Sequence, residues 1–255
     1  MRHLLHIYHA FAYYASWGFF MGAGLLVSVC CLPLLPWRNR EGLHKKTRAI
    51  QRALFRAWTW WFGASGVLRV VWKNFPAPGA PGPALAPGSV YVSNHPAVLD
   101  APLLLGRLPD CICVVKPAIM RNPALGAAAM TAGFVSGTND IDMIRAISEK
   151  IRAGSSLLIF PEGTRTEPGA ILNPFKPGFA LIAARAGAPV RLITIRATAG
   201  LVTRGRPWWK LPDVLPATIE FTLERAWPGD PAKTAHELSA EIESHTRARL
   251  QREKF

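Results

Sequence analysis

The stretch SNHPAVLD (residues 93–100) follows an apolar run from Val90 to Val92 and precedes a helical pattern. The run is β-branched and aromatic, which predicts a strand. Proline favours the first position of a helix and pushes the residue before it towards extended geometry. We therefore expect His95 at a strand-to-helix corner, with the proline opening the helix and Asp100 inside it.

The spacing of His95 and Asp100 limits how the two side chains can meet. Residues five apart do not share a face of one helix, so the corner has to fold the imidazole back towards the carboxylate. A carboxylate on one ring nitrogen fixes the tautomer and leaves the other nitrogen as a base. The alternative is a structural histidine held by a nearby carboxylate, and this stretch does not separate the two.

Around this corner, apolar runs alternate with helical patterns. The expected strands cover 66–73, 89–93, 111–116, 134–136, 155–160, 190–195 and 218–222, and the expected helices cover 98–105, 123–132, 141–153 and 179–186. Such alternation predicts an α/β fold in which helices flank a largely parallel sheet. The 255 residues suit one such domain with a full-sized core, which we expect over residues 66–230.

A second polar stretch, FPEGTR (residues 160–165), ends the expected strand 155–160. Open α/β sheets bind ligands at the carboxyl ends of their strands, so this turn and His95 can face one crevice. Gly163 permits a close backbone approach, and Arg165 offers a planar fork for a phosphate. Glu162 can anchor that arginine or accept a hydrogen bond from a substrate hydroxyl. A tight turn held by a Glu–Arg pair is the alternative.

The first 65 residues read as a membrane-binding helical region. No charged residue occurs from Ala10 to Trp37, a run of about 28 residues that is long enough to cross a bilayer. Basic residues follow it, which places that flank in the cytoplasm by the positive-inside rule. The run is too long for a secretory signal peptide. Prolines and glycines inside the run also permit a re-entrant helix pair, so spanning and dipping both stay open.

Three other segments bear on the membrane. Residues 43–64 alternate bases with bulky apolar groups, which predicts an amphipathic helix in the membrane interface or one packed on the domain's own core. The basic and aromatic loop 203–216 can touch lipid headgroups; alternatively, it is solvated with its tryptophans in the core. Residues 231–255 are expected as an exposed helical tail.

The amino-acid composition limits the kinds of partner and ligand that we expect this protein to bind. The formal charge is +14 and half of the residues are hydrophobic, so an anionic membrane surface is favoured over nucleic acid, for which no motif occurs. The pairs Cys30/Cys31 and Cys111/Cys113 lack zinc spacing and are expected as free buried thiols. The histidines cluster at the N-terminus without ligand spacing, so no metal is expected.

The two motifs, in this order and at this separation, resemble those of the glycerolipid acyltransferases typified by 1-acylglycerol-3-phosphate acyltransferase. The resemblance covers roughly residues 66–200. It implies a membrane-associated enzyme at the cytoplasmic face of a bacterial inner membrane. The enzyme would transfer a fatty acyl group from acyl-coenzyme A or acyl carrier protein to a lysophospholipid hydroxyl, without a cofactor. No Gly-x-Ser-x-Gly elbow occurs, so we expect direct attack on the thioester without an acyl-enzyme.

The same resemblance assigns the site residues. His95 is the expected general base and Asp100 its partner. The expected substrate-binding residues are Asn94, Lys116, Glu162, Gly163, Thr164 and Arg165, and Lys176 matches a further basic position of the family. The run of small residues from Gly126 to Ala129 predicts either tight helix packing or a passage for an acyl chain.

One departure from the family's pattern concerns the acceptor. The family's second motif usually ends with an arginine, but the stretch GFVSGTND (residues 133–140) has no basic residue. Lys116 or Arg121 can substitute, or the acceptor is another hydroxylated lipid, of the aminoacyl or polyene type. A non-catalytic lipid-binding module on the same fold is the alternative outside enzymes.

Overall fold

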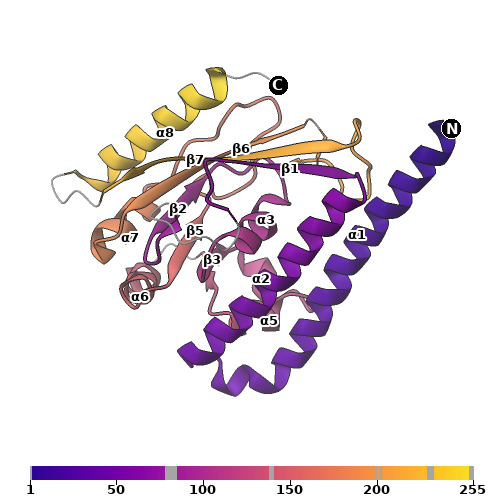
Figure 1. The fold of residues 1–255 in the computed structure, drawn as a ribbon. Coiled ribbons are helices and arrows are strands. Elements are labelled where there is room, and N and C mark those ends of the chain that lie inside the picture. Colours follow the sequence, from indigo (N-terminus) through magenta and orange to yellow (C-terminus); the bar gives the residue numbers. More distant parts are fainter. Residues whose placement is uncertain are drawn as a thin grey trace.

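Seven strands form one sheet in the order β1-β7-β6-β2-β5-β3-β4 (Figure 1). The computed structural model describes residues 2–77, 85–137, 141–198, 200–201, 203–228 and 233–252. The strands are β1 Leu68–Lys73, β2 Val90–Ser93, β3 Cys111–Val115, β4 Val135–Ser136, β5 Ser156–Ile159, β6 Val190–Ala197 and β7 Ala217–Trp227. Each overlaps an expected strand, and β7 extends well beyond the expected 218–222.

The sheet is mixed and mostly parallel. Strands β6, β2, β5, β3 and β4 run parallel to one another, β7 pairs antiparallel with β6, and β1 pairs parallel with β7. The predicted α/β class with a largely parallel sheet is therefore confirmed. Because β2 and β5 are adjacent and parallel, the segments that follow them leave the sheet at the same edge.

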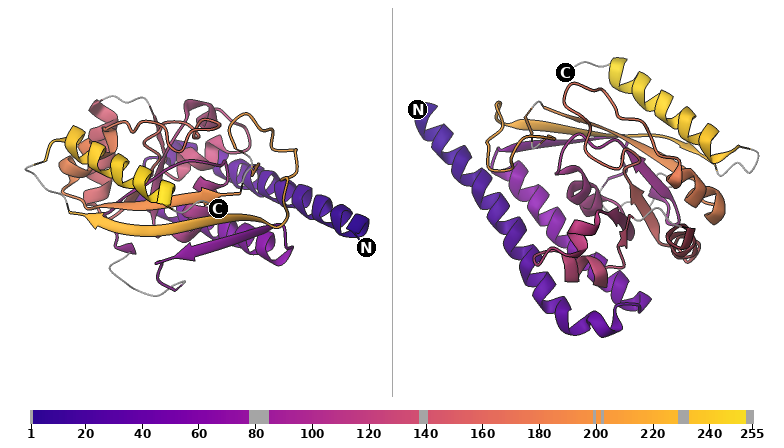
Figure 2. Two further views of the ribbon diagram at one scale, coloured as in Figure 1. Left: turned by 90° about the horizontal axis from the view of Figure 1, so that it is seen from above. Right: turned by 180° about the vertical axis from the view of Figure 1, so that it is seen from behind.

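Helices cover both faces of the sheet (Figures 1 and 2). One core joins the sheet to α1, α2 and α3, and a second core joins its other face to α6, α7 and α8. The helices are α1 Arg2–Cys31, the 3-10 helix η1 Leu32–Trp37, α2 Glu41–Ala64, α3 Asp100–Arg107, α4 Pro117–Met120, α5 Gly126–Thr131, α6 Ile141–Arg152, α7 Gly178–Ala186 and α8 Ala235–Arg252. Of these, α4 was not expected from the sequence.

The helix after β2 begins later than predicted. Residues 97–99 form a bend and turn, and α3 begins at Asp100, so the proline does not occupy the first helical position. The Asp100 carboxylate accepts a hydrogen bond from Ala97 N at 2.8 Å, which stabilises the turn before the helix. The expected corner is therefore a six-residue connection, residues 94–99, instead of a direct strand-to-helix junction.

The N-terminal region is a hairpin of two long helices (Figure 2). Helices α1 and α2 are joined by η1, which contains Pro36 and ends at Trp37. Trp58 of α2 donates to Ser16 O at 2.8 Å, and its ring lies 5.8 Å from that of Trp17. The segment His3–Trp37 is long and apolar enough to cross a membrane by length and composition, and most of it is exposed.

The aromatic residues of α2 divide between the core and the surface. Trp58 and Phe62 are buried, whereas Trp60 is 71% exposed. One face of this helix therefore packs on the domain's core, as one of the two predictions for residues 43–64 had it, and the opposite face is exposed.

The loop 203–216 lies against α1: Tyr13 donates to Trp208 O at 2.5 Å and Tyr14 donates to Trp209 O at 2.9 Å. Both tryptophans of the loop are exposed, so they are not part of the core.

A buried arginine fastens α2 to the sheet. Arg48 donates to Asp110 at 2.7 Å, to Glu41 at 2.9 Å and to Ala132 O at 3.0 Å. Asp110 directly precedes β3, so this anchor lies at the amino ends of the parallel strands. The guanidinium is the main polar contact between the hairpin and this edge of the domain.

The C-terminal helix corrects one expectation. Leu238 and Ile242, one helical turn apart, are buried against α7 and the sheet. Helix α8 is therefore a layer of the domain and not an exposed tail. Residues 253–255 lie outside the described part of the chain.

Candidate active site

A histidine–aspartate pair lies at the carboxyl end of β2. His95 Nδ1 is 2.8 Å from Asp100 Oδ2, as the corner was predicted to allow. The Asp100 side chain is fully buried, while the His95 side chain is 18% exposed. The carboxylate thus holds one ring nitrogen and leaves Nε2 as the nitrogen that can serve a substrate.

Burial shapes the electrostatics of this pair. Desolvation raises the pKa of Asp100, and the hydrogen bonds from His95 and Ala97 act in the opposite direction. When a substrate proton moves to Nε2, the carboxylate on Nδ1 can stabilise the charge that develops on the ring. The arrangement is one in which His95 can accept a proton from a substrate.

The second motif supports the backbone of His95. Glu162, which follows β5, is 5% exposed. Its carboxylate accepts from His95 N at 2.7 Å, from Asn173 N at 3.0 Å and from the Thr166 hydroxyl at 2.9 Å. Thr166 N in turn donates to His95 O at 2.8 Å. The two motifs therefore meet in one site, and Glu162 acts as a positioning residue there. Thr166 and Asn173 were missed by the sequence analysis.

Replacing Glu162 by alanine should lower stability markedly. Two backbone N–H groups and one hydroxyl would lose their acceptor, and unsatisfied buried donors cost about 1–3 kcal/mol each. We expect the free energy of unfolding in urea to fall by roughly 2–3 kcal/mol. Glu167→Ala, in the same loop and on the surface, is the matched control. Equal stability of the two variants would contradict this role of Glu162.

Asn94 fixes the end of β2 against β6. Its side-chain amide donates to Ile195 O at 2.8 Å, and its side-chain oxygen accepts from Ile195 N at 2.7 Å. Asn94 is 2% exposed. The predicted contact of Asn94 with substrate stays a prediction, since both of its polar atoms serve β6 in this structure.

Cationic side chains gather at the FPEGTR turn. Lys116 Nζ donates to Thr164 Oγ1 at 3.3 Å. Gly163 has a φ of +68°, and a Cβ built there would lie 3.2 Å from Lys176 Nζ. The positive φ favours glycine at this position, and a side chain there would also crowd the end of Lys176. Together with Arg165, these lysines line the same cavity as His95. The turn can hold an anionic group beside the base.

A cavity of about 610 Å³ leads from His95 into the protein. The His95 ring stacks on Phe160, with 4.2 Å between ring centroids, at its entrance. Most of the lining is apolar. The N-terminal hairpin, α3 and α5 contribute part of it, and much of the rest comes from β3, α4 and the segments after β5. Ala128 and Ala129 line it, whereas Gly126 packs closely against the backbone of Met120, so the run 126–129 combines tight packing with a border on the cavity. The cavity can take a long apolar chain whose polar end lies at His95.

The cysteines are free thiols. Cys31, Cys111 and Cys113 are buried as expected, but Cys30 is exposed. Burial raises the pKa of Cys113 to about 12, so this thiol is neutral and unreactive. Among the residues that the structure describes, no group of three or more histidine, cysteine or acidic side chains is placed to hold a metal ion.

The fold and the site together define a class of α/β protein. Its histidine–aspartate pair lies beside a cationic turn and lines a largely apolar cavity. A family model described as Acyltransferase matches residues 73–196, which include both motifs. Residues 73–196 therefore match the acyltransferase family.

Individual relatives agree with this assignment. The chloroplastic 1-acyl-sn-glycerol-3-phosphate acyltransferase of Brassica napus is 36% identical over 121 residues, which cover 46% of this chain and 35% of that protein. The 1-acyl-sn-glycerol-3-phosphate acyltransferase alpha of Mus musculus is 29% identical over 185 residues, and this match covers 70% of this chain and 60% of that protein. The chain thus spans about a third of the Brassica relative.

A solved structure shares the complete fold. The crystal structure of the 1-acyl-sn-glycerophosphate acyltransferase PlsC from Thermotoga maritima matches with a TM-score of 0.70 at 20% identity. The match covers 99% of this chain and 97% of that chain. The likeness therefore includes the N-terminal hairpin as well as the α/β domain.

Proposed function

We propose that this protein transfers a fatty acyl group from a thioester to the free hydroxyl of 1-acylglycerol-3-phosphate. The observation that carries the proposal is the position of His95. It lies at the mouth of a 610 Å³ apolar cavity and beside the cationic turn around Gly163. A phosphate on the turn and an acyl chain in the cavity place a hydroxyl and a thioester carbonyl on opposite sides of the imidazole.

The proposed reaction has two proton transfers through one nitrogen. His95 Nε2 removes the proton from the acceptor hydroxyl as its oxygen attacks the thioester carbonyl carbon. Asp100 stabilises the resulting imidazolium through Nδ1. The tetrahedral intermediate then breaks its carbon–sulfur bond, and His95 returns the proton to the leaving thiolate. An ester and a free thiol result, without a covalent enzyme intermediate.

The proposal extends to the donor and to the location. Acyl-coenzyme A and acyl carrier protein are both anionic, and a chain of charge +14 suits either. The outer faces of α1 and of the 203–216 loop expose large apolar side chains, among them Leu4, Phe11 and Trp209. We place these faces in the cytoplasmic leaflet of a bacterial inner membrane, where anionic lipid attracts the basic flank.

The test is an acyl-transfer assay with the purified full-length protein in detergent. Labelled palmitoyl-coenzyme A or palmitoyl carrier protein is offered with lysophosphatidate, lysophosphatidylcholine or an aminoacyl lipid carrying a free hydroxyl. Preference for lysophosphatidate supports the proposal. Preference for the aminoacyl lipid would assign a different acceptor. No transfer to any acceptor would favour the non-catalytic lipid-binding alternative.

Removing the lysines at the turn should weaken binding of the acceptor phosphate. In Lys116→Gln/Lys176→Gln we expect the KM for lysophosphatidate to rise roughly 30- to 150-fold. A charge-assisted contact contributes about 1.5–3 kcal/mol and a neutral one about 0.5–1.5 kcal/mol, so the two substitutions together lose about 2–3 kcal/mol. Arg145→Gln, an exposed position on α6, is the control. Monoacylglycerol has no phosphate, so its rate should stay nearly constant in both variants. A parallel loss with monoacylglycerol would count against a phosphate-binding role.

A further inference from the structure

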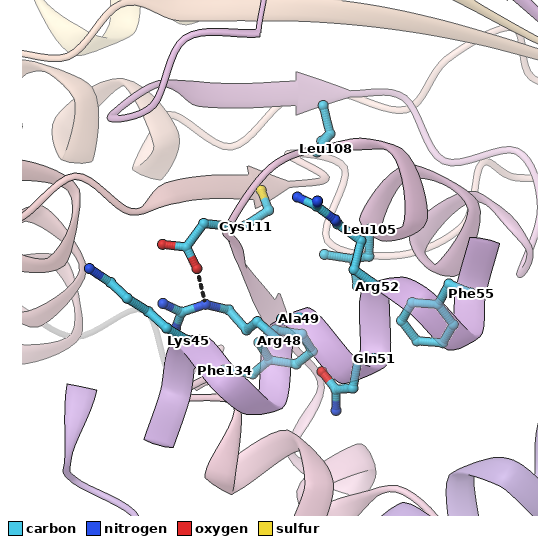
Figure 3. A pocket seen from close by; sticks show the side chains of 11 residues that line it. Lys45, Arg48, Ala49, Gln51, Arg52, Phe55, Leu105, Leu108, Cys111 and Phe134 are labelled. Carbon is cyan, nitrogen blue, oxygen red and sulfur yellow. Dashed lines mark hydrogen bonds and ion pairs between the residues drawn. The ribbon is translucent and has the colours of Figure 1, made fainter. Parts of the chain in front are cut away.

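A second cavity, of about 340 Å³, lies between α2 and α3 (Figure 3). Asp110, which lines it, precedes β3, so this cavity is at the amino ends of the parallel strands. His95 follows β2 at the opposite edge of the sheet. The volume is in the range of small-molecule sites, and neither motif contributes a residue to it.

The rim of this second cavity carries positive charge. Lys45, Arg48 and Arg52 of α2 all line it. Arg48 is neutralised by Asp110 and Glu41. Lys45 and Arg52 make no hydrogen bond or ion pair within the described residues, and Figure 3 shows them on either side of Arg48. Two cations are therefore available to an anionic ligand.

The floor of the second cavity is apolar. Leu105, Leu108 and Phe134 contribute to it, together with Cys111. Burial raises the pKa of the Cys111 thiol well above its usual range, so the thiol stays neutral and acts as an apolar lining group. A cationic rim over an apolar floor matches a ligand with an anionic end and a hydrocarbon part. A simple anion would make no contact with the apolar side chains of the floor.

The two cavities share a wall. Gln51, Phe55, Leu105 and Phe134 line both. The Gln51 amide donates to Ala128 O at 3.1 Å, and its side-chain oxygen is buried without a partner in the described part of the chain. A ligand in the second cavity would therefore contact side chains that also line the 610 Å³ cavity beside His95.

We propose that the second cavity binds an anionic phospholipid, with the phosphate on Lys45 and Arg52 and the first part of an acyl chain on Leu105, Leu108 and Phe134. A concave site of this volume admits a chain but not a helix of a partner protein. Ile50 and Trp60, on the outer face of the same helix, are exposed, so a lipid surface can reach the opening. The proposal does not depend on the acyl-transfer reaction.

The test reads occupancy at the cavity itself. Ala49 lines the second cavity and is exposed, whereas Ala53, one turn later on α2, is exposed and lines neither cavity. Ala49→Cys and Ala53→Cys are labelled with N-ethylmaleimide, and the modified peptide is followed by mass spectrometry. The probes are dihexanoyl phosphatidic acid, dihexanoyl phosphatidylcholine and inorganic phosphate at equal concentrations.

Site-specific protection is the expected result. At phosphatidic acid about four times its Kd, labelling at position 49 should slow roughly fivefold, and labelling at position 53 should not change. Lys45→Gln/Arg52→Gln should abolish the protection, while Lys46→Gln/Arg56→Gln, with the same charge change on the same helix, should keep it. No protection, or equal protection at both positions, would overturn the proposal. Equal protection by phosphatidylcholine or by inorganic phosphate would overturn the assignment to an anionic phospholipid.

Discussion

The variant His95→Ala is expected to lose acyl transfer by a factor of roughly 10³–10⁴. Without the imidazole, the acceptor hydroxyl keeps its proton at neutral pH and the leaving thiolate has no donor. The KM values should change little, since the cationic turn and the cavity contribute the binding. The measurement is the rate of formation of labelled diacyl product at saturating donor and acceptor.

Two further variants separate chemistry from folding. Asp100→Asn keeps the volume of the side chain but removes the charge that stabilises the imidazolium, and a loss of about 10²–10⁴ is expected. His236→Ala, on the exposed face of α8, should retain full activity. Near-wild-type rates in both His95→Ala and Asp100→Asn, in proteins with unchanged thermal unfolding, would end the general-base assignment.

The second large effect concerns stability. Arg48→Met should lower the free energy of unfolding by about 2 kcal/mol, which is below the range for breaking a fully buried ion pair because the Asp110 side chain is 33% exposed. Arg48 is 4% exposed, and its loss leaves Asp110 and the Ala132 carbonyl without their partner. The hairpin should detach from the amino edge of the sheet before the domain unfolds. Hydrogen exchange of the β3 and α5 amides would report this opening.

Arg56→Met is the matched control for Arg48→Met. Arg56 lies two turns later on α2 and is exposed, so its replacement should change stability by less than about 0.5 kcal/mol. If Arg48→Met were equally stable, the anchor would be unimportant. In that case the apolar contacts of Trp58 and Phe62 would hold the hairpin by themselves.

Periodicity and local motifs were sufficient to predict most of the fold. Each of the seven strands overlaps a predicted one, because buried parallel strands read as short apolar runs between turn residues. The meeting of His95, Asp100 and the FPEGTR turn also followed from the sequence, since both motifs end strands of one parallel sheet. The late start of α3 did not follow, because the Asp100 carboxylate stabilises a turn that residue preferences alone do not indicate.

The contacts that position the site could not be predicted, because they join distant segments. Glu162 reads as a partner for Arg165 or for substrate, yet it accepts from the His95 and Asn173 backbones. Nothing in the sequence around Asn173 signals that contact. The packing of α8 was missed because its two buried apolar residues are surrounded by charged ones. The second cavity arises from side chains of α2, α3 and the strand ends, so no single stretch encodes it.

The helix that forms part of the 610 Å³ cavity wall has a practical consequence for the preparation of this protein. Phe20, Gly24 and Val27, on the first helix, form part of the surface that would receive the fatty chain. Trimming the N-terminal 40 or so residues to obtain a detergent-free preparation would therefore open the chain-binding pocket to water. Solubility is better sought by polar substitutions on the outward-facing side of that helix, which leave the pocket closed.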